Sequence, residues 1–253
     1  MNIKKLVISA LLAAVCGLSA SAQQLDNMSM DQWSKKGGCW NPWPANSTSH
    51  SWDTANHGLS ILGMNGATPE YEHVAVKGPG KAAAKIETKK AMGILAAGSV
   101  YTGRFIKVVK MSGAKIEMGV PFTGRPKSLS GYVHYIPGKI DVASKKMQHL
   151  KGTMDQGVVE ISLRDGDQLE MMDTTDPKFQ DSKTEDFPNT VGHGVIYFKE
   201  DTKDYIYFEI PINYKNGNTP KNIVISTSSS RYAQQFTGST SSVMYVDELK
   251  LNY

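Results

Sequence analysis

The sequence has 253 residues, a formal net charge of +4 and two cysteines, Cys16 and Cys39. Its length suits one large all-β domain that can bury a core without disulfide staples. The isolated lysine pairs Lys89-Lys90 and Lys145-Lys146 have no interleaved aromatic residues, and the sequence shows no basic nucleic-acid-binding stripe.

The chain begins with a basic segment, a short apolar run and the sequence Ala20-Ser21-Ala22. This pattern predicts a secretory signal peptide over residues 1–22 and export to the periplasm, the cell surface or the medium. The alternative is a lipoprotein anchored at Cys16, although Val15 stands where a small residue is normally required. The apolar run is too short for a transmembrane helix, and no later run is longer.

Residues 23–37 are polar and are predicted to form a flexible tether before a single domain over 38–253. An aromatic cluster follows, because all four tryptophans lie within twenty residues: Trp33, Trp40, Trp43 and Trp52. Two prolines beside Trp43 exclude a helix there. Aromatic rings on a stiff loop stack on sugar rings, so we take Trp40, Trp43 and Trp52 as stacking candidates. The alternative is that these rings plug the open end of a sandwich.

Alternation of apolar and polar residues between Gly, Pro and Asn turns predicts a series of short strands. We place them at residues 73–77, 83–88, 99–109, 115–118, 129–135, 158–163, 195–198, 205–212, 222–228 and 243–253. This pattern predicts an all-β fold, a two-sheet β-sandwich, with a jelly roll as the favoured topology. Residues 164–186 are acidic and are predicted to form a long solvated loop, with Ca²⁺ binding as the less favoured alternative.

Two charged residues share a phase with apolar neighbours on their strands. Arg104 follows the phase of Val100 and Ile106, so it requires a carboxylate or carbonyl partner. Asp247 follows the phase of Leu249 and faces inward unless a bulge intervenes. An inward carboxylate must be paired or bound to a metal. We favour an arginine such as Arg104 or Arg231 as its partner, and a structural Ca²⁺ at Asp247 is the alternative.

The central stretch, residues 119–138, reads GVPFTGRPKSLSGYVHYIPG. Its first half is turn chemistry that holds Arg125 between a glycine and a proline, where it can meet a ligand or satisfy loop carbonyls. Its second half is a strand with Tyr132 and His134 on the polar face. Arg231 and Tyr232 belong to a loop before the last strand, and with Arg104 they complete the polar ligand-binding candidates.

Residues 119–138 closely resemble the signature of the putative carbohydrate metabolism domain, PCMD, a family found in secreted proteins of Gram-negative gut bacteria. The segments WDTANHG at 52–58 and YVDELKL at 245–251 are similar to the same family. The resemblance extends over roughly residues 38–253 and implies a β-sandwich associated with glycan utilisation. It implies no known reaction.

The favoured function is therefore glycan binding without catalysis, in which arginines donate hydrogen bonds to hydroxyls or to an acidic sugar. One alternative is a glycoside hydrolase or lyase. Hydrolysis needs two carboxyl groups about 5–10 Å apart, and no two glutamates pair in the sequence. Glu160 and Glu209 lie opposite the apolar residues of their strands and are predicted to face solvent. A structural or adhesin-like surface protein is a second alternative. The sequence predicts neither a catalytic residue nor a cofactor besides the possible Ca²⁺, and it leaves the oligomeric state open.

Overall fold

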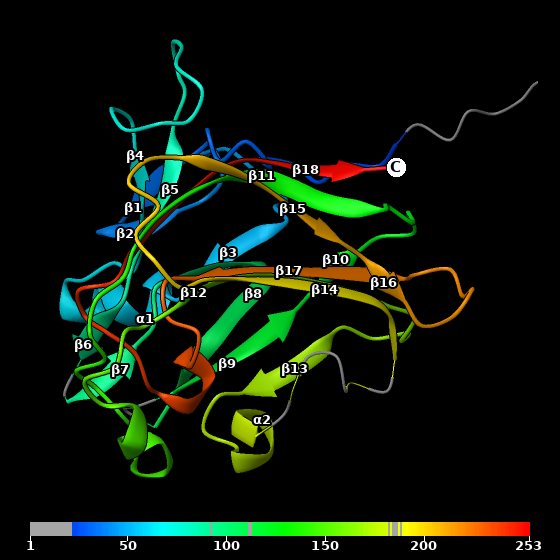
Figure 1. Ribbon diagram of the computed structural model, residues 1–253. Helices are drawn as coiled ribbons and strands as arrows, with labels where there is room; N and C mark the ends of the chain where they lie inside the picture. Colours follow the sequence, from blue (N-terminus) through cyan, green and yellow to red (C-terminus); the bar gives the residue numbers. More distant parts are fainter. Residues whose placement is uncertain (1–21, 92, 111–112, 182, 184–186, 188) are drawn as a thin grey trace, which may run out of the picture.

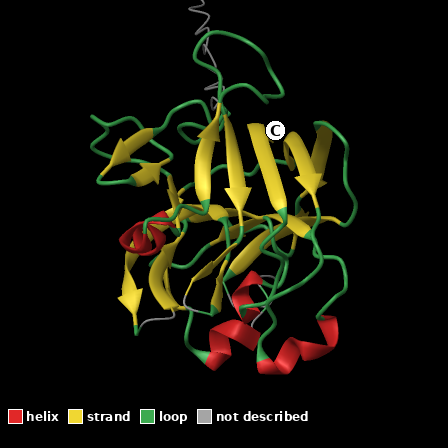
Figure 2. Cartoon of the chain, turned by 90° about the vertical axis from the view of Figure 1, so that its left-hand side faces the viewer, coloured by secondary structure: helices red, strands yellow, loops and turns green. Residues whose placement is uncertain are grey.

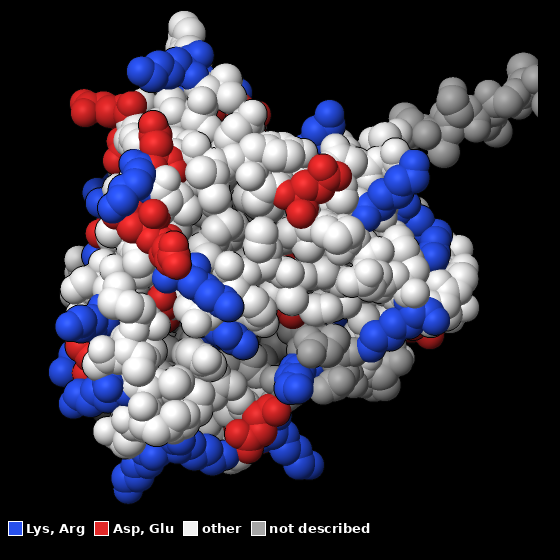
Figure 3. All heavy atoms as spheres, in the orientation of Figure 1, with Lys and Arg blue, Asp and Glu red and all other residues white. Residues whose placement is uncertain are grey.

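The computed structural model describes residues 22–91, 93–110, 113–181, 183, 187 and 189–253. The predicted signal peptide and the alternative lipid anchor at Cys16 lie outside these residues, apart from Ala22. Among the helices of the described segments, none combines the length and the apolar character that crossing a membrane requires. Lysines and arginines are scattered among acidic residues on the face shown in Figure 3, and wide areas of it carry neither.

Two antiparallel sheets pack face to face, as Figure 1 shows. The smaller sheet has the order β15-β11-β18-β5-β4, and the larger sheet has the order β13-β9-β8-β17-β12-β14-β16, with β3 beside β8 and β10 beside β17. An all-β, two-sheet sandwich is therefore confirmed, whereas the jelly-roll topology stays a prediction.

The strands of the smaller sheet are β4 (Ala67–Glu70), β5 (Ala83–Glu87), β11 (Ser128–Ile136), β15 (Ile206–Pro211) and β18 (Val243–Asn252). Those of the larger sheet are β3 (Trp52–Thr54), β8 (Ser99–Val109), β9 (Gly113–Met118), β10 (Val120–Pro121), β12 (Gly157–Arg164), β13 (Glu170–Asp173), β14 (Thr190–Phe198), β16 (Asn213–Tyr214) and β17 (Asn222–Ser228). Two hairpins lie outside both sheets: β1 (Ser34–Lys36) with β2 (Cys39–Asn41), and β6 (Lys89–Ala91) with β7 (Ile94–Ala96). The helical turns are α1 (Asn56–Leu59), η1 (Ser60–Leu62), η2 (Lys145–Leu150), α2 (Pro177–Asp181) and η4 (Ala233–Gln235).

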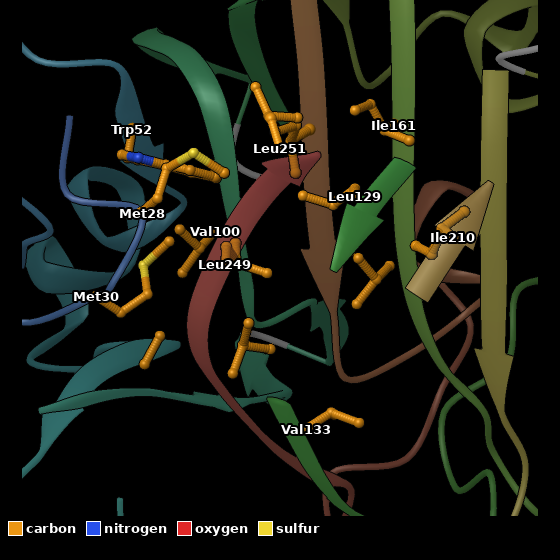
Figure 4. Packing of buried hydrophobic residues seen from close by; sticks show 14 of the residues in the cluster. Met28, Met30, Trp52, Val100, Leu129, Val133, Ile161, Ile210, Leu249 and Leu251 are labelled. Atoms are coloured by element: carbon orange, nitrogen blue, oxygen red, sulfur yellow. The ribbon is translucent and has the colours of Figure 1, made fainter. Parts of the chain in front are cut away.

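The core lies between the two sheets and follows the alternation of the sequence (Figure 4). On β12, Val159, Ile161 and Leu163 are fully buried and face the smaller sheet. On β11, Leu129 and Val133 occupy the equivalent positions. Each such side chain contributes about 1.5–3 kcal/mol when it leaves water, so the period-two pattern fixes which face of each strand turns inward.

The predicted tether, 23–37, is packed against the sandwich. Met28 and Met30 belong to the core cluster, and the Leu249 amide donates to the carbonyl of Met28. The indole of Trp52 donates to the carbonyl of Asp26 at 2.7 Å. The segment is therefore part of the domain and not a tether, because its few apolar side chains close the edge of the core.

Two further local predictions are wrong. Residues 73–77 were expected as a strand but lie in an irregular segment, because they have no strand to pair with and instead cover the outer face of the smaller sheet. Residues 164–186 are not one loop, since they include β13, which pairs with β9, and the short helix α2. The spans 99–109 and 222–228, by contrast, match β8 and β17.

A bulge in β18 decides the orientation of Asp247. Ser130 pairs with Lys250, but Tyr132 pairs with Asp247, so β18 carries one extra residue at this point. Glu248 takes a positive φ of 48° within the bulge. Val246 and Leu249 consequently both face the core, while Asp247 turns to the outer face of the smaller sheet. There it lies beneath residues 73–77, which we call the covering segment. The sequence predicted an inward Asp247 unless a bulge intervenes, and the bulge is present, so Asp247 does not face the core.

Candidate functional site

A cavity of about 350 Å³ lies against the larger sheet, on the face turned away from the smaller sheet. Strands β8, β17 and β12 form its floor, and β9 and β13 form one side. Residues of α1, η1, the β6–β7 hairpin, α2 and η4 complete its walls. Figures 1 and 2 show helical segments gathered on this side of the larger sheet. We call this cavity the groove.

The residues on the floor are those that alternate with the core residues of the same strands. On β12, Val158, Glu160 and Arg164 line the groove, while their neighbours Val159 and Ile161 are in the core. The strand period therefore places the polar positions of β12 in the groove. The prediction that Glu160 lies opposite its apolar neighbours holds, but the space that it faces is this groove.

A polar row crosses the middle of the floor. Tyr101 of β8 is the register partner of Ser226 of β17, and Ser226 is that of Glu160 of β12. Adjacent strands lie about 4.8 Å apart, so three polar side chains stand side by side over roughly 10 Å. Nε2 of His193, on the neighbouring β14, lies 2.8 Å from Oε1 of Glu160. This pair fixes the orientation of the carboxylate.

Two of the buried polar groups on the floor of the groove have unused hydrogen-bonding capacity. Tyr101 is 5% exposed, and its hydroxyl has no hydrogen-bond partner among the described residues. Burial raises the pKa of Tyr101 well above its usual value, so the phenol stays protonated and can donate. Arg164 is 4% exposed, and its Nη2 likewise has no partner within the described segments.

The rest of the Arg164 guanidinium is held in place. Its Nη1 forms an ion pair with Glu170, and its plane lies over the ring of Phe187 at 4.6 Å. Burial lowers the pKa of Arg164, and the charges of Glu170 and Glu160 oppose that change. One nitrogen of this fixed, charged group, Nη2, is therefore buried without a hydrogen-bond partner among the described residues.

Apolar and aromatic side chains form most of the remaining wall. They are Leu59, Leu62, Ile94, Leu95, Phe105, Val108, Ile116, Met118, Met172, Phe179, Phe187 and Phe236. A largely apolar pocket with a few placed polar groups is typical of small-molecule and cofactor sites. Exposed phenylalanine faces can also pack against the C–H faces of a pyranose.

Arg231 is the one residue of the sequence-predicted site that lines the groove. Its guanidinium lies 4.1 Å from the ring centre of Tyr197 and 5.2 Å from that of Tyr232. Tyr232 therefore supports Arg231 from beside the groove.

The tryptophan candidates lie away from the groove. Trp52 is fully buried in the core, on the opposite face of the larger sheet, so its ring has no face open to a sugar. Trp43 is half-buried and stacks on His50 with ring centres 3.7 Å apart. Trp40 is half-buried beneath Lys35 at the β1–β2 hairpin. The structure therefore does not bring these three rings together as one platform.

The other two arginine candidates are also elsewhere. Arg125 stacks on Tyr214 at 4.1 Å and donates to the carbonyls of Asn216 and Asn218, so it holds the turn after β16. Arg104 donates to the carbonyl of Gly103 at 2.7 Å. Among the described residues, Asp247 forms an ion pair with neither Arg104 nor Arg231, the two partners expected from the sequence, and its Oδ2 accepts the amide of Ala75 instead.

The remaining candidates lie on the outer face of the smaller sheet. Tyr132 meets Tyr207 edge to face. Nδ1 of His134 lies 2.7 Å from Nε2 of His73, and burial lowers the pKa of His134. The covering segment closes over this cluster, because Tyr205 donates to the carbonyl of His73 at 2.9 Å.

Asp247 was the candidate ligand for a structural Ca²⁺. Its Oδ2 accepts the amide of Ala75 at 2.8 Å, and burial raises its pKa to about 6. Its Oδ1 has no hydrogen-bond partner within the described residues. Within the described residues of the whole chain, no three His, Cys, Asp or Glu residues are grouped as a metal site. Calcium binding at Asp247 stays a prediction.

Sequence reasoning missed Tyr101, Ser226, Arg164 and the role of Glu160. The signal that could have found them was the set of polar residues alternating with core residues on β8, β17 and β12. That signal marks a solvent-facing sheet surface equally well. It becomes a site only when α2, η4 and the β6–β7 hairpin wall it in, and those contacts connect residues distant in sequence.

A family model described as "Putative carbohydrate metabolism domain" matches residues 29–252. No curated protein matches the chain. Among solved structures, a "putative glycoside hydrolase" from Bacteroides thetaiotaomicron is 20% identical with a TM-score of 0.62, covering 85% of this chain and 66% of its own. Another "putative glycoside hydrolase", from Bacteroides vulgatus, is 18% identical with a TM-score of 0.66, covering 87% of this chain and 94% of its own. At these identities the similarity concerns the fold.

Proposed function

Because the chain belongs to the family of the putative carbohydrate metabolism domain, we propose that it binds a polysaccharide or oligosaccharide in the groove and does not cleave it. A sugar there would lie on the floor of β8, β17 and β12, with its hydroxyls on the polar row. Phe105 and the other apolar residues of the wall would pack against its C–H faces.

The observation that carries this proposal is the pair of buried donors, the Tyr101 hydroxyl and Arg164 Nη2, which have no partner among the described residues. A buried polar group without a partner costs about 1–3 kcal/mol. A ligand rich in hydroxyl groups supplies acceptors for both donors, and an apolar ligand supplies none. A carbohydrate therefore fits the groove better than a hydrocarbon of the same size.

Catalysis is the second candidate, favoured by the position of Glu160 in the groove with His193 beside it. Glycoside hydrolysis commonly uses two carboxyl groups about 5–10 Å apart. Among the described residues that line the groove, Glu160 supplies the carboxylate and no second one accompanies it. This shortage supports binding over hydrolysis.

Affinity gels cast with a panel of polysaccharides, run with and without EDTA, test the proposal. We expect retention by at least one polymer, weaker retention of Tyr101→Phe, and no release of reducing sugar. Sugar release that disappears in Glu160→Gln would overturn the non-catalytic assignment. Loss of retention in EDTA would support the predicted structural Ca²⁺. No retention by any polymer would contradict the proposed function and favour the structural, adhesin-like alternative.

The cellular location of the protein is proposed from residues 1–22 alone. A protein exported by a signal peptide would meet polysaccharides in the periplasm, at the cell surface or in the medium. N-terminal sequencing of the protein from culture fractions tests this, and a mature chain that begins at Gln23 is the expected result. A lipid-modified N-terminus at Cys16 would instead support the lipoprotein alternative.

A further inference from the structure

Arg231 and Arg125 are both stacked on a tyrosine but differ in the groups to which their N–H groups donate. Each guanidinium lies 4.1 Å from the ring centre of a tyrosine, Tyr197 for Arg231 and Tyr214 for Arg125. Arg125 donates to the backbone carbonyls of Asn216 and Asn218, in the turn after β16. Arg231 donates to Oε1 of Gln156 at 2.9 Å, and its side chain lines the groove.

Among the described residues, no carboxylate forms an ion pair with Arg231. Asp155, the acidic residue nearest to Gln156 in sequence, uses its oxygens elsewhere. Its Oδ2 accepts the Ser230 hydroxyl at 2.6 Å and the Ser239 amide at 2.7 Å, and its Oδ1 accepts the Gln156 amide. The charge of Arg231 is therefore not neutralised by an acidic neighbour within the described part of the chain.

Resting on the proposed function, we propose that the glycan is acidic and that one of its anionic groups binds Arg231. A guanidinium fixed by aromatic rings is a planar fork with little freedom left to lose, and it matches carboxylate and sulfate oxygens geometrically. The aromatic stacking fixes the plane of the fork, and the N–H groups that do not bond to Gln156 are left for the anion.

The position of the anionic group along the groove follows from the other charges. Glu160 stands in the polar row at mid-floor and repels an anion there. The Arg231 end is next to Val158 and Ser228, which carry no charge. Arg164, at the other end of β12, already has the carboxylate of Glu170. The Arg231 end is thus the part of the groove with charge complementary to an acid.

Two pairs of polymers test the inference, each pair with one backbone and different charge: polygalacturonate with its methyl ester, and dextran sulfate with dextran. We expect the charged member of one pair to bind at least about tenfold more tightly, because a hydrogen bond between two charged groups is stronger than one between neutral groups. The first pair reports a carboxylate and the second a sulfate.

The matched variants are Arg231→Gln and Arg125→Gln, which remove the same charge from similar tyrosine-stacked arginines. We expect Arg231→Gln to abolish the preference for the charged polymer and Arg125→Gln to retain it. Arg231→Lys keeps the charge without the fork and should restore only part of the preference. This comparison separates a specific site from the general attraction of a chain with net charge +4 for polyanions.

Each other outcome counts against the inference. Equal binding of charged and neutral members would refute an acidic ligand and leave carbohydrate binding intact. A charge preference that survives in Arg231→Gln would place the acid elsewhere. If neither pair binds while the wider panel retains the protein, the inference fails and the proposed function stands. If the panel fails too, both are wrong.

Discussion

Two polar clusters occupy opposite outer faces of the sandwich. On the smaller sheet, His73, His134 and Tyr205 are joined by hydrogen bonds and covered by a segment of the same chain. On the larger sheet, Tyr101 and Arg164 leave donors without partners in the described residues and border a cavity. The two faces have similar residue types. The comparison teaches that the covering segment, more than composition, separates a polar seal from a ligand site.

The largest effect is expected from filling the groove. Ser226 lies at the centre of the polar row, so Ser226→Phe would occupy the space above the floor. We expect retention on the polysaccharide gel to disappear while the thermal midpoint changes little. Tyr132→Phe, on the outer face of the smaller sheet, is the control and should bind normally. Normal retention of Ser226→Phe would place the ligand outside the groove.

The next effect is the pH dependence of stability, which reports on the outer face of the smaller sheet. Burial raises the folded-state pKa of Asp247 from 3.8 to about 6, so this group contributes stability below pH 4 that is lost as the pH rises through about 6. Two pKa units correspond to about 3 kcal/mol as an upper value. We measure urea unfolding at pH 4, 5, 6, 7 and 8. The free energy of unfolding of Asp247→Asn should rise relative to that of the wild type between pH 4 and about 6.

The pKa shift of His134 has the opposite effect on the pH dependence of stability, and Asp247→Asn separates the two contributions. The lowered pKa of His134 gives stability that is present above pH 6.5 and is lost as the pH falls below that value. Both proteins keep His134, so the difference between their free energies of unfolding reports Asp247. A difference that does not change between pH 4 and 8 would show that Asp247 titrates as an ordinary surface carboxylate.

A matched pair of tyrosines gives a smaller effect. Tyr205→Phe removes the hydrogen bond to the His73 carbonyl and should cost about 1 kcal/mol of stability without changing glycan affinity. Tyr101→Phe removes a hydroxyl without a described partner, so the fold should lose nothing and glycan affinity should fall about tenfold. Chemical unfolding and titration calorimetry measure the two effects. An exchange of the two phenotypes would reverse the assignment of the faces.

The smallest effect is expected from Trp40→Ala. Trp40 is half-buried beneath Lys35 and does not line the groove, so retention on the gel should stay within error of the wild type. A clear loss would return the binding site to the tryptophan cluster predicted from the sequence.

The sequence alone determined the sandwich. Period-two alternation identified β8 and β17 at their observed bounds, because burial of one face is recorded residue by residue along a strand. It failed at residues 23–37, where Met28 and Met30 join the core, and at residues 73–77. In both segments the structure depends on what packs against the chain.

The site was decided by tertiary structure. Of three candidate arginines, only Arg231 borders the groove, since Arg125 holds a turn and Arg104 bonds to the carbonyl beside it. One extra residue in β18 turned Asp247 from the core to the outer face. Alternation specifies that a side chain points away from the core, but not whether it faces water, a covering segment or a cavity. That outcome depends on contacts between residues far apart in the chain, which no local pattern encodes.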